Sequence, residues 1–443
     1  MSRSGVRSWA GWILLALVAS LGISLLDSEW RGAALRTVRD GELAEDLKRP
    51  ELWGVEYGFI GAHLAAGRGF AGPYPEVTSP TAVMPPVLPL LFGAVFALTG
   101  YQTSSSFVLL QLLRALVVGL GLGCLDRCGL ELGATSPRAR ALFRALGAAF
   151  ILVFAPRRLF HQIYDEWFLF GAVAMALLLA LRLFRRGPRR RLQVVGWGVV
   201  LGAMALTQPV VAFAAGLATL AAAGRARRPG WLWALLVAAL VVAPWSIRNA
   251  VHFDSPLPVK STLFFELYYG TLISPRGIHL EEEVMTSGRH PFFPGAERQR
   301  ALAMGEGAYF AEKRRLFVES LVTQPQLYLA KTTYRLAYAT VLFPYSRAHR
   351  VFFNPVVPTA LKFALYPLPF MGLILCWPRR GERRPDLLFL VVFYVAYLLP
   401  YVLIHFWLRY WVQLLPLHVL LIYRGYGELH AWRDGVRATT RSA

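Results

Sequence analysis

Residues 165–186 read DEWFLFGAVAMALLLALRLFRR, an apolar run that begins with two acids and ends in an arginine cluster. A run of about 20 apolar residues is long enough to cross a bilayer as a helix. The arginines continue to residue 191, and similar basic blocks at 225–228 and 379–384 also lie between apolar runs. Because basic residues collect on the cytoplasmic side of membrane proteins, the stretch predicts a helix with an acidic outer end and a basic inner end.

The composition extends this interpretation to the whole chain. Of its 443 residues, 56% are hydrophobic and 16% are charged, whereas a soluble domain carries about 25% charged residues. The expected fold is therefore an all-α polytopic membrane protein with the lipid bilayer as a partner. The net charge of +21 is confined to short blocks between apolar runs, which argues against nucleic acid as a partner. The three cysteines have no spacing that predicts a disulfide framework or a zinc site.

Charge also predicts the topology. If Arg3 and Arg7 are cytoplasmic, residues 27–82 lie outside, and this segment carries nine acidic and six basic residues. The later basic blocks all fall inside if 84–99 and 326–343 stay at the outer surface without crossing. The result is about ten transmembrane helices with both termini in the cytoplasm. The candidate apolar runs are 10–26, 84–99, 106–124, 141–156, 165–184, 193–207, 209–223, 231–246, 357–377, 386–404 and 410–425. They form a single domain over 1–425, with outer loops 27–105 and 247–356 and a cytoplasmic tail at 426–443.

Three acids are candidates for catalysis. Glu56 begins a short helix in VEYGFIGAHLAAGRGF (55–70), where the positive end of the helix dipole favours the ionised carboxylate. Taken alone, it is more often an acid that only stabilises the helix. Asp165 and Glu166 lie at the outer mouth of a span, where charge is costly and often functional. Their structural alternative is an ion pair with the neighbouring arginines.

Cations at the outer boundary are the second feature. They are Arg157, Arg158, Arg248 and Arg409. Each could extend to lipid headgroups, but several on one face predict a phosphate site, because guanidinium binds phosphate in a bidentate manner.

The third feature is the segment 287–325, which reads as a loop and then an amphipathic helix. Its expected apolar side consists of Met304, Tyr309, Phe310, Phe317 and Leu321. His290 and Glu306 are candidate substrate contacts, with a structural role as the alternative. Together with Glu297 they lack metal-ligand spacing. The chain contains no nucleotide-binding motif, so an enzyme of this kind would draw its activated substrate from the bilayer.

Four stretches carry a resemblance. They are EYGFIGAHLAAGRGF (56–70), SPTAVMPPVLPLLFGAVFALTG (79–100), APWSIRNAVHFDSPLPVKST (243–262) and LRYWVQLLPL (408–417). In this order they resemble motifs of the GT-C superfamily of membrane glycosyltransferases, in the bacterial branch related to protein O-mannosyltransferases and the lipid A aminoarabinose transferase. The ordered set covers about residues 40–420.

The resemblance implies a GT-C-type bundle with juxtamembrane helices in the first outer loop. It also implies inverting transfer of a sugar from a polyprenyl-phosphate donor to a lipid, glycan or protein acceptor, at the outer face of a bacterial inner membrane. The implied base is Glu56, and the implied second acid is Asp165 or Glu166. The implied phosphate ligands are Arg248, Arg409 and Arg157, and the expected substrate contacts are Tyr57, His290 and Glu306.

One position departs from this family's pattern. Val55 stands where many members have an aspartate before the glutamate. No cofactor is assigned, and a divalent metal ion stays open. The alternatives to an enzyme are a transporter or lipid flippase and a non-catalytic scaffold of an envelope assembly. The lack of internal repeats and the large outer loops favour the enzyme.

Overall fold

The computed structural model describes the chain in segments. They are residues 3–26, 33, 44–45, 48, 53–74, 76, 79–160, 164–187, 191–227, 229–253, 257–279, 287–343, 357–377 and 384–442. The expected outer loops therefore lie partly outside the described residues, chiefly before residue 53 and at 280–286 and 344–356. The regular elements of the described segments are helices, apart from two strands of two residues each.

Four described helices are long and apolar enough to cross a membrane: α5 (Ser104–Glu131), α8 (Glu166–Arg186), α11 (Leu232–Phe253) and α20 (Pro385–Leu403). Shorter apolar stretches lie in α1 (Arg3–Leu26), α4 (Val87–Thr99), α9 (Arg191–Ala205), α10 (Pro209–Arg225), α18 (Thr359–Leu365) and α19 (Leu368–Leu375). The all-α membrane fold is thus confirmed, while the count of about ten spans stays a prediction. Two further long helices are α6 (Pro137–Phe154) and α22 (Leu415–Ser442), and the latter continues through the expected tail boundary at residue 426.

The bundle is held by close pairs of helices. The tightest neighbours are α10 with α20, α5 with α8, α9 with α11, and α1 with α5. In the α9–α11 pair, Gly198 and Gly202 allow the backbones to approach, because a Cβ on Gly198 would lie 2.5 Å from the carbonyl oxygen of Ala234. Small residues four apart are typical of helix contacts inside membranes. The outer side of α11 leaves apolar residues such as Trp233 and Leu240 exposed, as expected of a surface that lipid covers.

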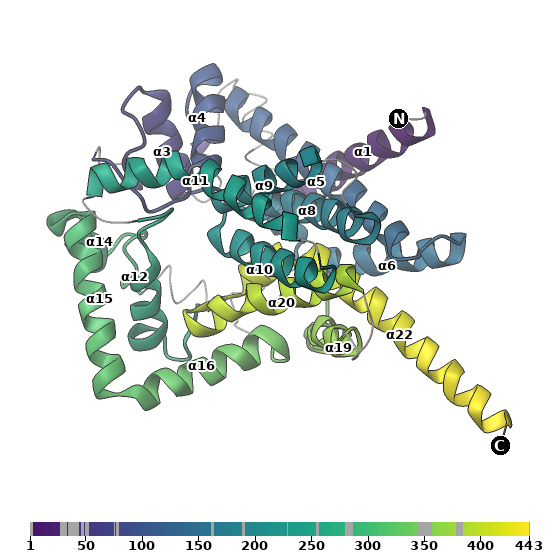
Figure 1. Ribbon diagram of the computed structural model, residues 1–443. Coiled ribbons are helices and arrows are strands. Elements are labelled where there is room, and N and C mark those ends of the chain that lie inside the picture. The colour runs from purple at the N-terminus through teal and green to yellow at the C-terminus, as the bar shows by residue number, and fades with distance from the viewer. Residues whose placement is uncertain are drawn as a thin grey trace.

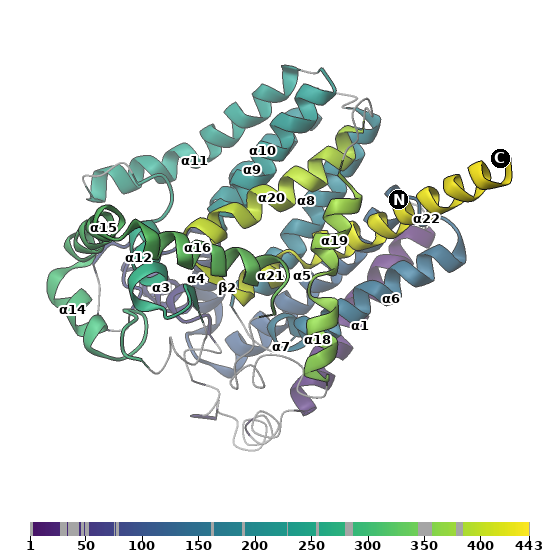
Figure 2. The same ribbon diagram turned by 90° about the horizontal axis from the view of Figure 1, so that it is seen from below.

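The elements of the two predicted outer loops gather at one end of the molecule, and both termini lie at the other end (Figures 1 and 2). The first loop supplies α3 (Glu56–Ala65), which packs on α4. The second supplies α12 (Leu263–Tyr268), the π-helix η4 (Tyr269–Ile273), β1 (Ile278–His279), α14 (Ala296–Met304), α15 (Glu306–Thr323) and α16 (Pro325–Thr340). Near them lie α7 (Pro156–Phe160), β2 (Phe406–Trp407) and α21 (Leu408–Gln413), and the 3₁₀ turn η3 (Pro229–Trp231) precedes α11.

One expected helix is two helices. Gly305 has a φ of 77° and separates α14 from α15, so Met304 ends the first helix instead of sharing a face with the residues of the second. The expectation of one continuous apolar side was wrong at this point, because a left-handed glycine ends a helix. Tyr309, Phe310 and Phe317 are buried along α15 as expected, whereas Leu321 is exposed.

Candidate functional site

A cleft lies at the end of the bundle where the outer elements gather. It contains about 1000 Å³ of space, counting its open mouth. Its polar lining comes from α3, α7, α12, α21 and the loops beside them: Glu56, Tyr57, Arg158, Tyr164, Gln208, Lys260, Thr262, Glu266, His290, Arg409 and Tyr410. Apolar residues such as Met84, Phe292 and Trp407 complete the wall. Four of the residues predicted from the sequence, Glu56, Tyr57, His290 and Arg409, therefore share one cleft.

Glu56 is positioned by a tight turn. The residues before it, Gly54 and Val55, have φ angles of 81° and 45°, and positive φ is unfavourable for a β-branched residue. Two positions later, a Cβ on Gly58 would lie only 2.1 Å from the carbonyl oxygen of Trp53. The turn and this close approach together fix the start of α3, so the direction of the Glu56 side chain is set by the backbone.

The Glu56 carboxylate is 4% exposed and accepts a hydrogen bond of 3.0 Å from the hydroxyl of Tyr164. Burial raises its pKa above the ordinary value of 4.5, and the hydrogen bond and the charges of Arg409 and Lys260 work against that rise. A carboxylate whose pKa lies nearer neutrality is a stronger base than a solvated one. Glu56 is thus a partly desolvated base beside fixed positive charge.

Positive charge lines the same cleft as Glu56. The guanidinium of Arg409 lies 4.4 Å from the ring centre of Tyr164 and 4.5 Å from that of Trp407, and aromatic faces of this kind hold a cation in place. Lys260 and Arg158 line the same cleft. Burial lowers the pKa of the Lys260 amine. Three cations around one cleft are suited to an anionic group such as a phosphate.

Asp165 and Glu166 lie behind the cleft wall instead of lining it. Asp165 Oδ2 accepts hydrogen bonds of 3.4 Å from the Tyr57 hydroxyl and from the side-chain amide of Gln413. Glu166 is fully buried, and its carboxylate forms an ion pair of 3.0 Å with Arg158. Each acid therefore holds a residue that does line the cleft. This geometry favours a role in which Asp165 positions Tyr57 and Glu166 positions Arg158.

Two other predicted residues hold loops together outside the cleft lining. Arg248 donates hydrogen bonds of 2.7 Å to the carbonyl oxygen of Thr81 and 3.0 Å to that of Phe70. Glu306 accepts hydrogen bonds from Thr81, Ala82 and Ser261. Both residues join the first outer loop to the second. Arg157 lies in α7, and its side chain is outside the described part of the structure.

His290 lies in the cleft wall as a neutral base. It is 3% exposed, and its Nδ1 accepts a hydrogen bond of 3.3 Å from the backbone N–H of Phe292. Burial lowers its pKa to about 3, with a further contribution from the charge of Arg409. The ring therefore offers a neutral edge to a ligand in the cleft.

Sequence reasoning assigned no role to Lys260 or Glu266, although both line the cleft. Lys260 lies inside one of the stretches that carry the resemblance, so a signal for it was present in the sequence. Glu266 lies on a short helix with no distinctive pattern around it. Burial raises the pKa of its carboxyl to about 7.

A metal ion at Glu56 does not fit this geometry. Among the described residues, the one group of three ligand side chains that converge is Glu266, His279 and His405. Neither Glu56 nor the pair Asp165–Glu166 belongs to it.

Comparison with models of protein families, with curated proteins and with solved structures gives no match to this chain.

Proposed function

We propose that the cleft is the active site of an inverting glycosyltransferase that uses a polyprenyl-phosphate sugar as donor. The observation that carries the proposal is the placement of a desolvated carboxylate, Glu56, beside Arg409 and Lys260 in a cleft at the end of an apolar helix bundle. A sugar linked to a lipid phosphate needs these features together. It requires a base for the acceptor, cations for the phosphate and an opening next to the bilayer.

The chemistry follows from the roles of these groups. Glu56 takes the proton of the acceptor hydroxyl while the acceptor oxygen forms a bond to the anomeric carbon. The bond from that carbon to the phosphate oxygen breaks, and its electron pair leaves with the polyprenyl phosphate. Arg409 and Lys260 stabilise the charge that develops on the phosphate. Attack from the face opposite the leaving group inverts the anomeric configuration.

The membrane location supports the same substrate class. The described helices are those of a membrane protein, and the sequence has no motif that would bind a nucleotide-activated sugar. A lipid-linked donor reaches the cleft by lateral diffusion in the bilayer. We place the cleft at the outer face of a bacterial inner membrane, with both termini in the cytoplasm, because this orientation puts the basic blocks inside. The acceptor is a hydroxyl of a lipid, glycan or protein.

The test is transfer of radiolabelled sugar from a panel of polyprenyl-phosphate donors in membranes that contain the wild type, Glu56→Gln or Arg409→Lys. We expect Glu56→Gln to abolish transfer, because glutamine cannot take a proton. Arg409→Lys should raise KM for the donor, because lysine cannot bind phosphate in a bidentate manner. The matched control is Glu76→Gln, which removes the same charge from an exposed residue of the first outer loop.

Two results would refute parts of the proposal. Undiminished transfer by Glu56→Gln, with the chain inserted at wild-type levels, would remove Glu56 from the role of base. Absence of transfer from every donor by the wild type would reject the glycosyltransferase and favour a lipid transporter or a scaffold.

A further inference from the structure

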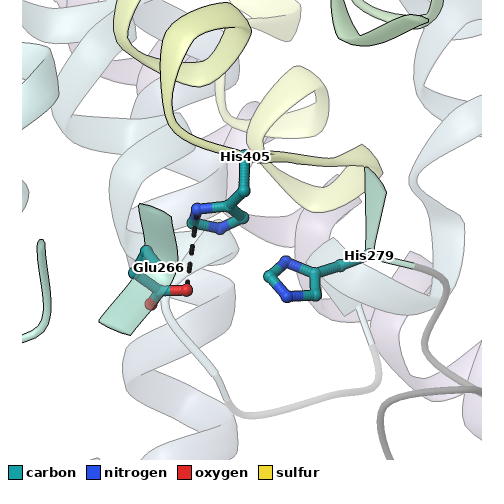
Figure 3. A group of neighbouring side chains, drawn as sticks. All are labelled: Glu266, His279 and His405. Carbon is teal, nitrogen blue, oxygen red and sulfur yellow. Dashed lines mark ion pairs between the residues drawn. The ribbon is translucent and has the colours of Figure 1, made fainter. Parts of the chain in front are cut away.

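Three side chains from distant parts of the chain converge beside the cleft (Figure 3). Glu266 comes from α12, His279 ends β1, and His405 directly precedes β2. Their ligand atoms all lie within 4.8 Å of one another. The parallel pairing of β1 with β2, in which His279 lies opposite Trp407, brings the two histidines together. The convergence is therefore built into the backbone.

The ring of His405 is oriented by two neighbours. Its Nε2 lies 3.1 Å from the Tyr410 hydroxyl, and its Nδ1 lies 3.6 Å from a Glu266 carboxylate oxygen. If Nε2 donates its proton to the tyrosine oxygen, the lone pair of Nδ1 faces the carboxylate. The contact is then satisfied either by a hydrogen on Nδ1, with the Tyr410 hydroxyl donating to Nε2 instead, or by a metal ion between the two atoms. A proton or a metal ion would satisfy this pair equally well.

The surroundings of His279 distinguish between a proton and a metal ion at this contact. It is 3% exposed, and neither ring nitrogen has a hydrogen-bond partner among the described residues. A buried polar atom without a partner costs about 1–3 kcal/mol. A proton shared by His405 and Glu266 would leave His279 unsatisfied, whereas a metal ion would bind all three. His418 is also buried and unpartnered, but it belongs to no such group of three in the described part of the chain.

We propose that Glu266, His279 and His405 bind one divalent transition-metal ion, with Zn²⁺ as the best match. Two imidazoles and one carboxylate are typical ligands of zinc, which binds them at about 2.0–2.2 Å. Tetrahedral geometry at that bond length places ligand atoms about 3.4 Å apart. The 3.6 Å between His405 and Glu266 is close to this separation. Ligand atoms that lie up to 4.8 Å apart need to approach by up to about 1.4 Å on binding.

The surroundings select against hard cations. Mg²⁺ and Ca²⁺ prefer sites made of oxygen atoms, whereas this group offers two nitrogens. Three protein ligands leave a fourth position for water or a substrate oxygen. Because Glu266 also lines the cleft, the bound ion would lie at the cleft wall.

Metal binding by the purified full-length protein tests this site without any assay of activity. The protein is dialysed against a chelator and titrated with Zn²⁺ in competition with a chromophoric chelator. We expect one tight site in the wild type. Tyr410→Phe should weaken it by about 10- to 100-fold, since it removes the group that orients His405. Glu266→Gln, His279→Gln and His405→Gln should each weaken it more than that.

His418→Gln is the matched control, because it removes a second buried, unpartnered imidazole and should bind zinc like the wild type. Circular dichroism and elution volume establish that each variant is folded. X-ray absorption at the zinc edge of the wild type gives an answer even if a variant fails to fold, and two imidazole ligands with oxygen are expected. A wild type that binds no zinc stoichiometrically would overturn the proposal. So would a spectrum with sulfur or only oxygen ligands, or folded ligand variants that bind as the wild type does.

Discussion

Glu306 was predicted to contact substrate, but its hydrogen bonds predict that it stabilises the outer region instead. This role can be measured as a change in stability. Its carboxylate accepts from the Thr81 hydroxyl at 2.6 Å, the backbone N–H of Ala82 at 3.0 Å and the Ser261 hydroxyl at 2.8 Å. These three partners lie in two loops that flank the cleft, and Glu306 is the first residue of α15. The carboxylate therefore joins three segments of the outer region at one point.

The expected loss of stability depends on which hydrogen-bond donors each substitution leaves without an acceptor. In Glu306→Ala all three donors lose their acceptor, and the hydroxyls can rotate to new partners while the Ala82 N–H cannot. One buried N–H without a partner and two weakened hydroxyl bonds predict a loss of about 2–4 kcal/mol in stability. In Glu306→Gln the amide oxygen can still accept from Ala82 and Ser261, and its N–H₂ can donate to the Thr81 oxygen. The expected loss is then below about 1 kcal/mol.

The assay pairs thermal unfolding in detergent with the sugar-transfer reaction. We expect Glu306→Ala to lower both the unfolding midpoint and the rate, and Glu306→Gln to preserve both. Glu319→Ala is the control, because it removes an exposed carboxylate from the same helix that pairs only with Arg315 among the described residues. A Glu306→Gln protein with wild-type stability but a large loss of transfer would refute this reasoning, because only a substrate contact would need the charge.

Two further predictions concern Glu56. Gly58→Ala should abolish transfer without unfolding the bundle, because its Cβ would lie 2.1 Å from the Trp53 carbonyl oxygen and displace the start of α3. The control Gly196→Ala should be neutral, because open space surrounds that position. Equal activity of the two variants would contradict the argument. The value of kcat/KM should fall as the pH is lowered and Glu56 is protonated. The midpoint of this fall should lie above pH 4.5, because burial raises the pKa of the carboxyl. A midpoint at or below pH 4.5 would show that a different group titrates.

The helices were largely predictable because charged residues or prolines mark the ends of most apolar runs. The run predicted at 165–184 is the helix Glu166–Arg186, and the run at 386–404 is the helix Pro385–Leu403. Charge and proline mark these ends in the sequence. The exceptions are breaks inside a predicted run or helix: at Gly305, between α18 and α19 in the run 357–377, and between α21 and α22 in the run 410–425. A glycine inside a polar, mixed segment does not reveal whether it ends a helix.

The site was only partly predictable, and the reason is physical. A charged residue near the membrane boundary has the same sequence signature whether it contacts a ligand, as Glu56 and Arg409 are proposed to do, or another loop, as Arg248 does. The two uses differ only in which backbone atoms come within reach, and this depends on tertiary packing. The same limit applies to His279 and His405, whose proximity depends on a strand pairing of two residues that no periodic pattern announces.

Charge in the cleft also couples the two substrates of the proposed reaction. Before the donor binds, Arg409 and Lys260 lower the pKa of Glu56 and so weaken it as a base. A bound phosphate neutralises these cations, and the effect of burial on the Glu56 carboxylate then prevails. The base therefore becomes strongest when the leaving group is in place, which disfavours loss of the acceptor proton before the donor is bound. Since kcat reports the complex and kcat/KM the free enzyme, the acidic limb of kcat should lie at higher pH than that of kcat/KM.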